Sequence, residues 1–503
     1  MTQPEPQSMS ESAAPAAVIE AELREALLDV QRQLHQEKPC SVALIIVGMP
    51  AAGRSEVVNK LLEWLDPKHV MVHAREPDCL AQLHPPLWRY WNTLPARGEM
   101  AIYFLGWYDD YLRSQLLTAK QARVRAPRMV ERIGQLETML LADGVRILKL
   151  YLQVDRKQQR RRLADLLASK ATRWRVTDED RWLARHYNRV RRVMKECVRL
   201  THSESSPWHV IDAADSQQRV VAAGALLLEQ MQAGLQRRSV TAQRYDWPTE
   251  SPSLPVKSAP DLPPLSDEAY HKELERLQGR LALLVRKRRF AKRAAVFAFE
   301  GMDASGKGGA IRRITAALDA RQYDVVPVSA PTPEELAHPY LWRFWRRIPP
   351  RGHIAIFDRS WYGRVLVERV RDLTPEADWQ RAYAEIREFE LQLAEAGTVV
   401  QKFWLAVGKD EQLTRLQQRA NDPLKGYKVD PEDWANRRFY DAYQLAAADM
   451  IERTHTPCAP WIVVEADDKR HARLEVLRAV VAAIERGLEG KIVVAGEQAT
   501  EPG

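Results

Sequence analysis

The sequence has few cysteines, no long apolar run and no leader-like start. Only four of its 503 residues are cysteines, widely spaced and without a CxxC pair, so we expect neither a disulfide framework nor a structural zinc site. The longest apolar stretches, around residues 42–49 and 220–228, fall short of the ~18 residues that a membrane-spanning helix needs. The first 17 residues are rich in Pro, Ser and Glu and lack the basic start and apolar core of a signal peptide. We therefore expect a cytoplasmic protein that does not associate with membranes.

Positive charge is in moderate excess. The chain has 75 Lys and Arg residues against 67 Asp and Glu residues, a net charge of +8. Hydrophobic residues are 45% of the sequence and charged residues 28%, which is typical of globular proteins and excludes wholesale disorder. The basic excess suits a polyanionic partner such as nucleic acid, acidic lipid or a phosphate-rich substrate.

The chain is an internal duplication. Residues 84–108 (HPPLWRYWNTLPARGEMAIYFLGWY) and 338–362 (HPYLWRFWRRIPPRGHIAIFDRSWY) are identical at 13 of 25 positions, at a constant offset of 254. Upstream, GMPAAGRS from Gly48 aligns with GMDASGKG from Gly301 at an offset of 253. Such self-similarity identifies two copies of one structural unit.

The two copies predict two domains, at 15–240 and 266–490. The segment between them, 241–265, is rich in proline and has no apolar periodicity, as in a semi-rigid linker. The second copy has apolar runs of strand length, separated by longer helical segments such as 308–319 and 379–396. These runs lie at 295–299, 324–328, 353–357, 399–407 and 461–464. Their alternation with helices predicts an α/β fold, a tandem duplication in which each parallel sheet lies between helix layers.

A phosphate-binding loop follows the first of these strands. Gly301, Gly306 and Lys307 form the GxxxxGK pattern between a strand and a helix, where backbone amides, the helix N-terminus and the lysine all attract phosphate. The alternative is a glycine-rich turn that only caps a helix. Gly308 stands where such loops usually have a Ser or Thr for Mg²⁺, so a metal needs another ligand, and Asp303 is the candidate within the loop.

A second acidic candidate, Asp358, ends the strand at 353–357. A carboxylate at this position beside a phosphate loop binds Mg²⁺ directly or through water. Arg359 and Arg364 follow and place two guanidinium groups toward the phosphates. The alternative, a helix cap with a surface ion pair, is disfavoured because the phosphate loop is present.

The remaining basic residues exceed what one nucleotide needs. Arginines cluster at Arg343, Arg346, Arg347 and Arg351, interleaved with tryptophans that we interpret as packing residues. A helical insertion at 409–456 resembles a lid that closes on anions and excludes water. Its basic residues are Lys409, Arg415, Arg419, Lys425 and Lys428. We expect about half of these charges to be simply solvated.

The first copy keeps packing residues and loses those assigned to chemistry. Its replacements are Arg54 for Lys307, Pro50 for Asp303, Phe104 for Asp358, Leu105 for Arg359, Asp110 for Arg364, and Asn92 and Thr93 for Arg346 and Arg347. We therefore predict a degenerate, non-catalytic first domain. Residues that both copies share, such as His84 and His338, are better interpreted as structural, which weighs against His338 as a phosphorylated nucleophile.

These motifs resemble the polyphosphate kinase 2 family. The resemblance rests on GMDASGKG from Gly301, DRSWYGRVLVERV from Asp358 and the segment ending THTPCAPWIVVEADDKR. It implies a P-loop kinase fold with a helical lid, dependence on Mg²⁺ with Mn²⁺ as an alternative, and no covalent intermediate. By this resemblance Asp303 and Asp358 would serve the metal, and Lys307 and Arg359 the transferring phosphoryl group. Glu368 would support the site, and Lys409, Arg415 and Lys428 would be the basic residues of the lid.

The fused form resembles the polyphosphate:AMP phosphotransferase group, in which the second copy is the active one. The implied reaction moves the terminal phosphoryl group of inorganic polyphosphate to AMP and yields ADP. Alternatives are a polyphosphate-dependent ADP or GDP kinase, the reverse reaction that lengthens polyphosphate, and a non-enzymatic P-loop protein that binds polyanions or nucleic acid. No RNA- or DNA-binding motif is present, so nucleic acid is not an expected partner. Self-association into a homo-oligomer is left open.

Overall fold

The computed structural model of the chain describes residues 16–74, 81–117, 120–236, 265–422, 434 and 436–490. The chain forms two compact units, each built mainly from one copy of the repeat. The first draws on segments within 1–76, 89–241 and 331–343, and the second on segments within 77–88, 242–330 and 344–503. The predicted linker lies outside the described residues, apart from Leu265.

The described part of the chain bears on membrane association and on disulfide bonding. None of its helices is both long enough and apolar enough to cross a membrane. Its cysteines, Cys40, Cys197 and Cys458, are all free thiols.

Each unit contains a five-stranded parallel sheet, and both sheets have the same strand order. The first sheet has the order β2-β3-β1-β4-β5, with β1 (Ser41–Gly48), β2 (Val70–His73), β3 (Met100–Phe104), β4 (Val145–Gln153) and β5 (Trp208–Asp212). The second has the order β7-β8-β6-β9-β10, with β6 (Ala294–Gly301), β7 (Tyr323–Pro327), β8 (Ile354–Asp358), β9 (Thr398–Ala406) and β10 (Trp461–Glu465). The five apolar runs of the second copy are these strands, so the predicted α/β fold is confirmed.

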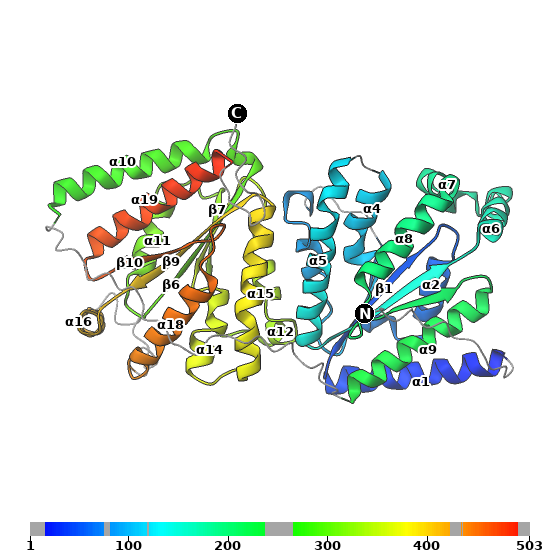
Figure 1. Cartoon of the computed structure of the whole chain (residues 1–503). Helices are drawn as coiled ribbons and strands as arrows, with labels where there is room; N and C mark the ends of the chain where they lie inside the picture. Colours follow the sequence, from blue (N-terminus) through cyan, green and yellow to red (C-terminus); the bar gives the residue numbers. More distant parts are fainter. Residues whose placement is uncertain are drawn as a thin grey trace, which may run out of the picture. The chain divides into compact units, whose positions relative to one another are not determined.

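Helices cover both faces of each sheet (Figure 1). In the first unit, one face carries α1 (Ala16–Glu37), α2 (Arg54–Trp64) and α9 (Ser216–Leu235), and the other α4 (Asp109–Leu117), α5 (Lys120–Ala142) and α8 (Tyr187–Thr201). In the second, one face carries α10 (Asp267–Val285), α11 (Lys307–Thr315) and α19 (Lys469–Leu488), and the other α14 (Val367–Val370), α15 (Glu376–Glu395) and α18 (Tyr440–Thr454). The other helices are α3 (Trp88–Trp91), α6 (Arg156–Ala168), α7 (Asp178–Arg185), α12 (Pro333–Leu336), α13 (Trp342–Trp345) and α16 (Lys409–Ala420). Because both faces are covered, every residue of β1 and of β9 is buried.

The tryptophans interleaved with the arginine cluster are packing residues, as expected. Trp342 is 4% exposed and Trp345 is 1% exposed, and Trp91, the equivalent of Trp345 in the first copy, is also 1% exposed. His338 stacks on Trp342 with ring centroids 3.8 Å apart, and His84 stacks on Trp88 at 3.9 Å. The shared histidines therefore make the same packing contact in both copies.

A buried ion pair lies at the same place in both sheets. The Lys402 Nζ atom donates to Glu390 Oε2 at 2.7 Å, to Tyr362 Oη at 2.9 Å and to the Thr454 carbonyl at 2.8 Å. The Lys402 side chain is fully buried and that of Glu390 is 1% exposed. Two uncharged partners, Tyr362 Oη and Trp361 Nε1, donate to Glu390 Oε1. Burial without such partners would cost several kcal/mol per charge.

The first copy repeats this network. Lys149 Nζ donates to Glu137 Oε2 at 2.9 Å and to the Thr201 carbonyl at 2.8 Å, and Trp107 Nε1 donates to Glu137 Oε1. Because the copy that lacks the predicted acidic site residues keeps this ion pair, we assign the pair to the fold rather than to chemistry.

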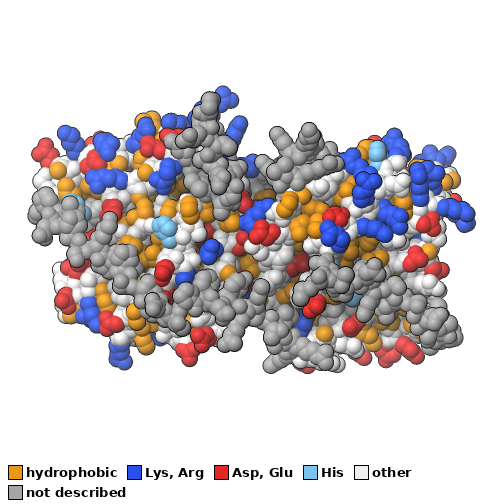
Figure 2. Space-filling view, viewed as in Figure 1, with side chains coloured by type: hydrophobic (Ala, Val, Ile, Leu, Met, Phe, Trp, Pro, Cys, Tyr) orange, Lys and Arg blue, Asp and Glu red, His pale blue; other side chains and the backbone are white. Residues whose placement is uncertain are grey.

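Positive charge on the surface is distributed unevenly. In the first unit, Lys and Arg side chains gather over α6, α7 and α8 (Figure 2).

Candidate active site

The glycine-rich loop connects β6 to α11. Strand β6 ends at Gly301, and α11 begins at Lys307 after the N-cap Gly306, whose φ is 106°. A Cβ atom at Gly301 would lie 2.6 Å from the carbonyl oxygen of Leu405 on β9, so only glycine fits there. Gly308 lies in the first turn of α11, where open space surrounds its Cα. The predicted strand–loop–helix connection is therefore present, and a helix N-terminus of this kind attracts anions.

Lys307 lies beneath the loop. It is 9% exposed, and its Nζ atom donates to the carbonyl oxygens of Gly301 at 2.7 Å and Met302 at 3.2 Å. Burial lowers the pKa of Lys307, and the positive charge of Arg359 lowers it further. The carboxylates of Asp303 and Asp358 oppose that change. The lysine therefore interacts with three of the four other charged residues that the sequence assigned to catalysis, and Glu368 is the exception.

Asp303 is held by two elements besides its own loop. Arg359 Nη2 donates to Asp303 Oδ1 at 2.5 Å, and Asn436 Nδ2 donates to Asp303 Oδ2 at 2.9 Å. Gln412 Nε2 donates to the Asp303 carbonyl at 3.1 Å. Arg359 has a φ of 63°, and its amide donates to the Phe299 carbonyl at 3.0 Å. The turn after β8 is thereby fixed to β6, which aims the guanidinium group at the loop.

Asp358 occupies the carboxyl end of β8, where it pairs in register with Phe299 of β6. The two predicted metal ligands therefore belong to adjacent parallel strands: Asp358 is the last residue of β8, and Asp303 lies two residues after the end of β6. Among the described residues, no group of three or more His, Cys, Asp or Glu side chains converges. Two carboxylates beside a phosphate loop suit Mg²⁺, which keeps several waters and takes its remaining ligands from substrate phosphates. The residues present thus fit Mg²⁺.

A buried carboxylate that the sequence had not singled out lies next to this group. Glu300 is 5% exposed at the end of β6, and Ser360 Oγ donates to its Oε1 atom at 2.7 Å. Burial raises the pKa of Glu300, while the hydrogen bond from Ser360 and the charges of Lys307 and Arg359 lower it in part. The equivalent residues of the first copy are Val47 and Gly106, so the pair is specific to the second copy.

The other predicted residues form ion pairs of their own, are exposed, or lie outside the described residues. Arg364 pairs with Glu368 at 2.7 Å, and Arg343 of α13 pairs with Glu335 at 3.4 Å. Lys409 at the start of α16 pairs with Asp441 at 3.1 Å. Arg346 and Arg347 are exposed and follow α13, and Lys428 lies outside the described residues. The roles assigned to these residues stay predictions.

Arg415 has a structural task that the sequence did not reveal. It is 2% exposed, and its guanidinium group donates to four carbonyl oxygens, those of Ala304, Ser305, Ala466 and Asp467. It therefore ties the phosphate loop to the segment after β10. The equivalent residue of the first copy, Arg162, makes the same kind of bonds to residues 51, 213 and 214.

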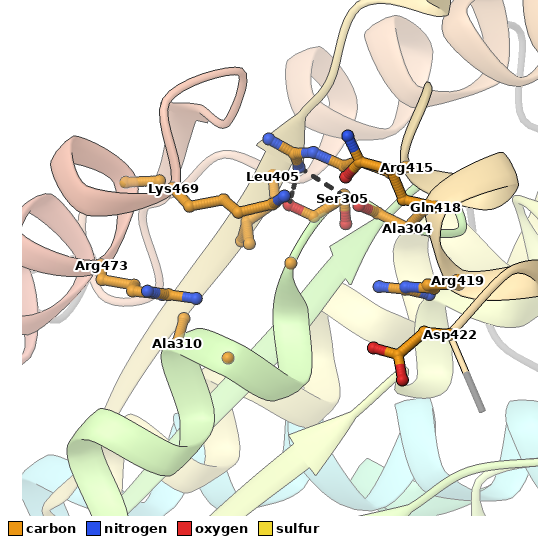
Figure 3. A pocket seen from close by; sticks show the side chains of 13 residues that line it. Ala304, Ser305, Ala310, Leu405, Arg415, Gln418, Arg419, Asp422, Lys469 and Arg473 are labelled. Atoms are coloured by element: carbon orange, nitrogen blue, oxygen red, sulfur yellow. Dashed lines mark hydrogen bonds between the residues drawn. The ribbon is translucent and has the colours of Figure 1, made fainter. Parts of the chain in front are cut away.

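A pocket of about 420 Å³ opens on one side of the loop (Figure 3). Four cations line it, together with one carboxylate and small or apolar side chains. The charged residues are Arg415, Arg419, Lys469, Arg473 and Asp422. Arg419 from α16 and Arg473 from α19 extend toward each other from opposite sides (Figure 3).

One cation of this pocket, Arg415, pairs with Glu411 at 2.6 Å, and the positive charges of Arg415, Arg419 and Arg473 all act on Lys469. Burial lowers the pKa of Lys469, and the guanidinium groups of Arg415 and Arg473 lower it further. The Ser305 Oγ atom, buried at the wall of this pocket, has no hydrogen-bond partner among the described residues. An anion is the ligand that would relieve the repulsion between these cations.

Three of the four cations are specific to the second copy. Arg419, Lys469 and Arg473 correspond to Leu166, Ser216 and Val220 of the first copy, whereas Arg415 corresponds to Arg162. Asn436 likewise corresponds to Leu183. The comparison between copies could have found all of these residues, but only once the alignment is carried through the lid and the last strand.

The first copy keeps the backbone of the site without its side chains. Ala51 and Leu105 have φ values of 59° and 62°, against 62° and 63° for the equivalent Ala304 and Arg359. The guanidinium group of Arg219, however, packs so closely on the loop that a Cβ atom at Gly53 would lie 2.6 Å from it. The second copy has Ala472 at that position.

Comparison with known proteins covers both copies. A model of the family described as Polyphosphate kinase 2 matches residues 12–239 and 264–490. The polyphosphate:AMP phosphotransferase of Pseudomonas syringae pv. tomato is 43% identical over 469 residues, which cover 92% of this chain and 94% of that protein. The enzyme of the same name from Pseudomonas aeruginosa is 42% identical over 471 residues with the same coverage. A crystal structure of a polyphosphate kinase 2 from P. aeruginosa PA01 matches with a TM-score of 0.83 at 39% identity, over 96% of this chain and 98% of that one.

Proposed function

This chain belongs to the polyphosphate kinase 2 family, and we propose that it transfers the terminal phosphoryl group of inorganic polyphosphate to AMP. In this reaction the terminal P–O–P bond of polyphosphate breaks and an oxygen of the AMP phosphate bonds to the released phosphorus. The products are ADP and a polyphosphate chain one unit shorter. The names of its two similar full-length relatives support the choice of AMP as the acceptor.

The single observation that carries the proposal is the charged cluster at the phosphate loop. Lys307, Arg359 and Asp303 are fixed by hydrogen bonds at the end of β6. Phosphoryl transfer between two polyanions needs alignment and neutralisation more than it needs a nucleophilic side chain. The Lys307 amine and the Arg359 guanidinium group would bind oxygens of the transferring phosphoryl group, and the loop amides would orient it.

Asp303 and Asp358 would hold the divalent cation, for which we propose Mg²⁺. Once bound, this ion neutralises phosphate oxygens and strengthens the electrophilic character of the phosphorus. Arg359 and Asn436 both donate to Asp303 and hold its carboxylate in place. The AMP phosphate is ionised near neutral pH, so a general base has little to remove.

The cationic pocket suits polyphosphate. No aromatic side chain lines it, and an inorganic chain has no base that needs stacking. On the other side of the loop, a smaller pocket is lined by Asp303 and Arg359 together with the rings of Trp404 and Tyr443. We therefore place the polyphosphate tail toward Arg419, Lys469 and Arg473, and the nucleotide toward the aromatic side.

We assign the chemistry to the second copy alone. The first copy has no carboxylate at the two positions that would hold the metal, and Arg219 fills the space against its loop. The first copy keeps the buried ion pair and the turn conformations. This supports the view that the unit is retained for structure or binding.

The test is a product analysis. The purified full-length chain is incubated with Mg²⁺ and polyphosphate, and with AMP, ADP, GMP or GDP in separate reactions, and the nucleotides are separated by chromatography. We expect ADP from AMP as the fastest product. Faster conversion of ADP or GDP to a triphosphate would make the chain a nucleoside diphosphate kinase instead, and no conversion of any of the four would contradict the proposal.

A further inference from the structure

The positive charge of this protein is concentrated in the copy that lacks the catalytic residues. Residues 155–199 of the first copy correspond to the lid segment 408–452 of the second. The first segment contains fifteen Lys and Arg residues against six Asp and Glu residues, a net charge of +9. The second contains seven against nine, a net charge of −2. The net charge of the whole chain is +8, so this one segment outweighs the rest.

The basic residues of the first segment lie on its surface. Seven of them, which we call the basic face, are exposed on α6 and α8: Arg156, Lys157, Arg160, Arg161, Arg191, Arg192 and Lys195. In α6 they follow one another at one-turn intervals, because 156 and 160, and 157 and 161, are four residues apart. Figure 2 shows Lys and Arg side chains gathered over this part of the first unit.

The acidic residues of the segment do not neutralise the basic face. Glu196 pairs with Arg199, Asp178 with Arg181, and Glu179 with Arg113, which lies outside the segment. Asp155 and Asp180 accept hydrogen bonds from backbone amides at the N-termini of α6 and α7. Among the described residues, no ion pair is formed by any of the seven side chains of the basic face.

The seven residues of the basic face do not line the pocket at the glycine-rich loop of the first copy. That pocket, of about 850 Å³, is lined by four arginines and four carboxylates. Its charges are balanced, and Arg219 already occupies the loop. A ligand that responds to the unbalanced charge would therefore bind along the outer surface of α6 and α8, and it would need to be extended.

We propose that the basic face is a second, non-catalytic binding site for inorganic polyphosphate. A polymer with about one negative charge per phosphate can contact a row of cations along a helix and release condensed counterions at each contact. The two helices of the basic face offer no ring on which nucleic-acid bases stack, because Tyr187 of α8 is buried and α6 has no aromatic residue. An exposed ring, that of Trp174, lies just beyond the end of α6. The row of cations without interleaved rings favours a polyanion without bases, and a comparison with RNA tests the alternative.

Such a site would act through local concentration. A polymer held by one part of the chain presents its remaining phosphates to the catalytic site intramolecularly, which raises apparent affinity without a new catalytic contact. The inference rests on the proposed function for the identity of the polymer. It predicts an effect on KM for long-chain polyphosphate and none on kcat.

The experiment compares two charge-reversed variants of the full chain. The first carries Arg160→Glu, Arg161→Glu and Arg192→Glu. The matched control carries Lys287→Glu, Arg288→Glu and Arg289→Glu, which alter three exposed basic residues of the second copy and change the net charge by the same amount. Binding of fluorescently labelled long-chain polyphosphate is measured at several salt concentrations, and circular dichroism verifies folding.

We expect the first variant to bind polyphosphate about tenfold or more weakly, with the slope of log Kd against log salt reduced by about 2 for three lost contacts. Its KM for long-chain polyphosphate rises and its kcat stays within twofold, while the control keeps the parent affinity within twofold. Equal losses in both variants would overturn the proposal, as would parent-like binding by the first. So would a tighter, equally variant-sensitive affinity for single-stranded RNA of similar charge. Because binding is measured without turnover, failure of the proposed reaction would not be mistaken for failure of this site.

Discussion

Replacing the three pocket cations specific to the second copy by their first-copy equivalents should weaken the use of polyphosphate and leave AMP unaffected. The variant carries Arg419→Leu, Lys469→Ser and Arg473→Val. All three side chains line the pocket beside the loop, and Lys469 is exposed while the other two are half-buried. A contact of this kind with phosphate contributes about 0.5–1 kcal/mol, between an exposed ion pair and a buried charged hydrogen bond. Together they contribute about 1.5–3 kcal/mol, or roughly 10- to 100-fold in KM for polyphosphate.

The assay is steady-state ADP formation with each substrate varied in turn. At saturating polyphosphate, kcat should stay within about threefold, because the residues at the loop are intact. The salt dependence of KM for polyphosphate should flatten by about 2 in logarithmic slope. A matched control with Lys287→Ser, Arg288→Leu and Arg289→Val removes the same charges elsewhere and should leave both KM values unchanged. A rise confined to the KM for AMP would place the nucleotide in this pocket and refute the reasoning.

Three further predictions concern the metal, the exposed arginines and the fold. Asp303→Asn and Asp358→Asn should each raise the Mg²⁺ concentration needed for half-maximal rate by about tenfold or more, since each removes a charged ligand; lost activity with an unchanged Mg²⁺ requirement would exclude the metal role. Arg346→Asn combined with Arg347→Thr should raise the KM for polyphosphate by a smaller factor, about threefold, because both side chains are exposed; a defect in KM for AMP alone would contradict it. Lys402→Met and Lys149→Met should each lower the free energy of unfolding of their own unit by about 3–5 kcal/mol in urea titrations, because each leaves a buried glutamate unpaired. A loss below about 1 kcal/mol would show that the pair is dispensable.

The strands of the second copy could be predicted because parallel strands buried on both faces have continuous apolar sequences. All five runs became strands, with ends that differ by two residues or fewer. Helix ends were less well defined, and α11 stops at Thr315, four residues before the expected end. Ala316 is the C-cap of α11. The apolar pattern of the sequence does not distinguish residue 315 from residue 319 as the end of the helix.

The loop and its charged partners were accessible to sequence reasoning because Lys307 and Asp358 lie in motifs with fixed positions relative to strands. Asn436, Lys469 and Arg473 were missed because they lie outside these motifs, in the segment before α18 and on α19. Only an alignment of the two copies carried through the lid and the last strand would have found them. Arg415 shows the opposite difficulty. Its charge suggested a phosphate ligand, but the structure uses its donors for four backbone carbonyls.

The most direct test compares equivalent positions of the two loops in one assay. ADP formation from AMP and polyphosphate is measured for the parent chain, for Lys307→Ala and for Arg54→Ala. We predict that Lys307→Ala lowers kcat by about 10²–10³, the usual cost of removing one electrostatic stabiliser of a transition state. Arg54→Ala should leave kcat within about threefold. Parent-like turnover by Lys307→Ala, or an equal loss in both variants, would contradict the assignment of the chemistry to the second copy.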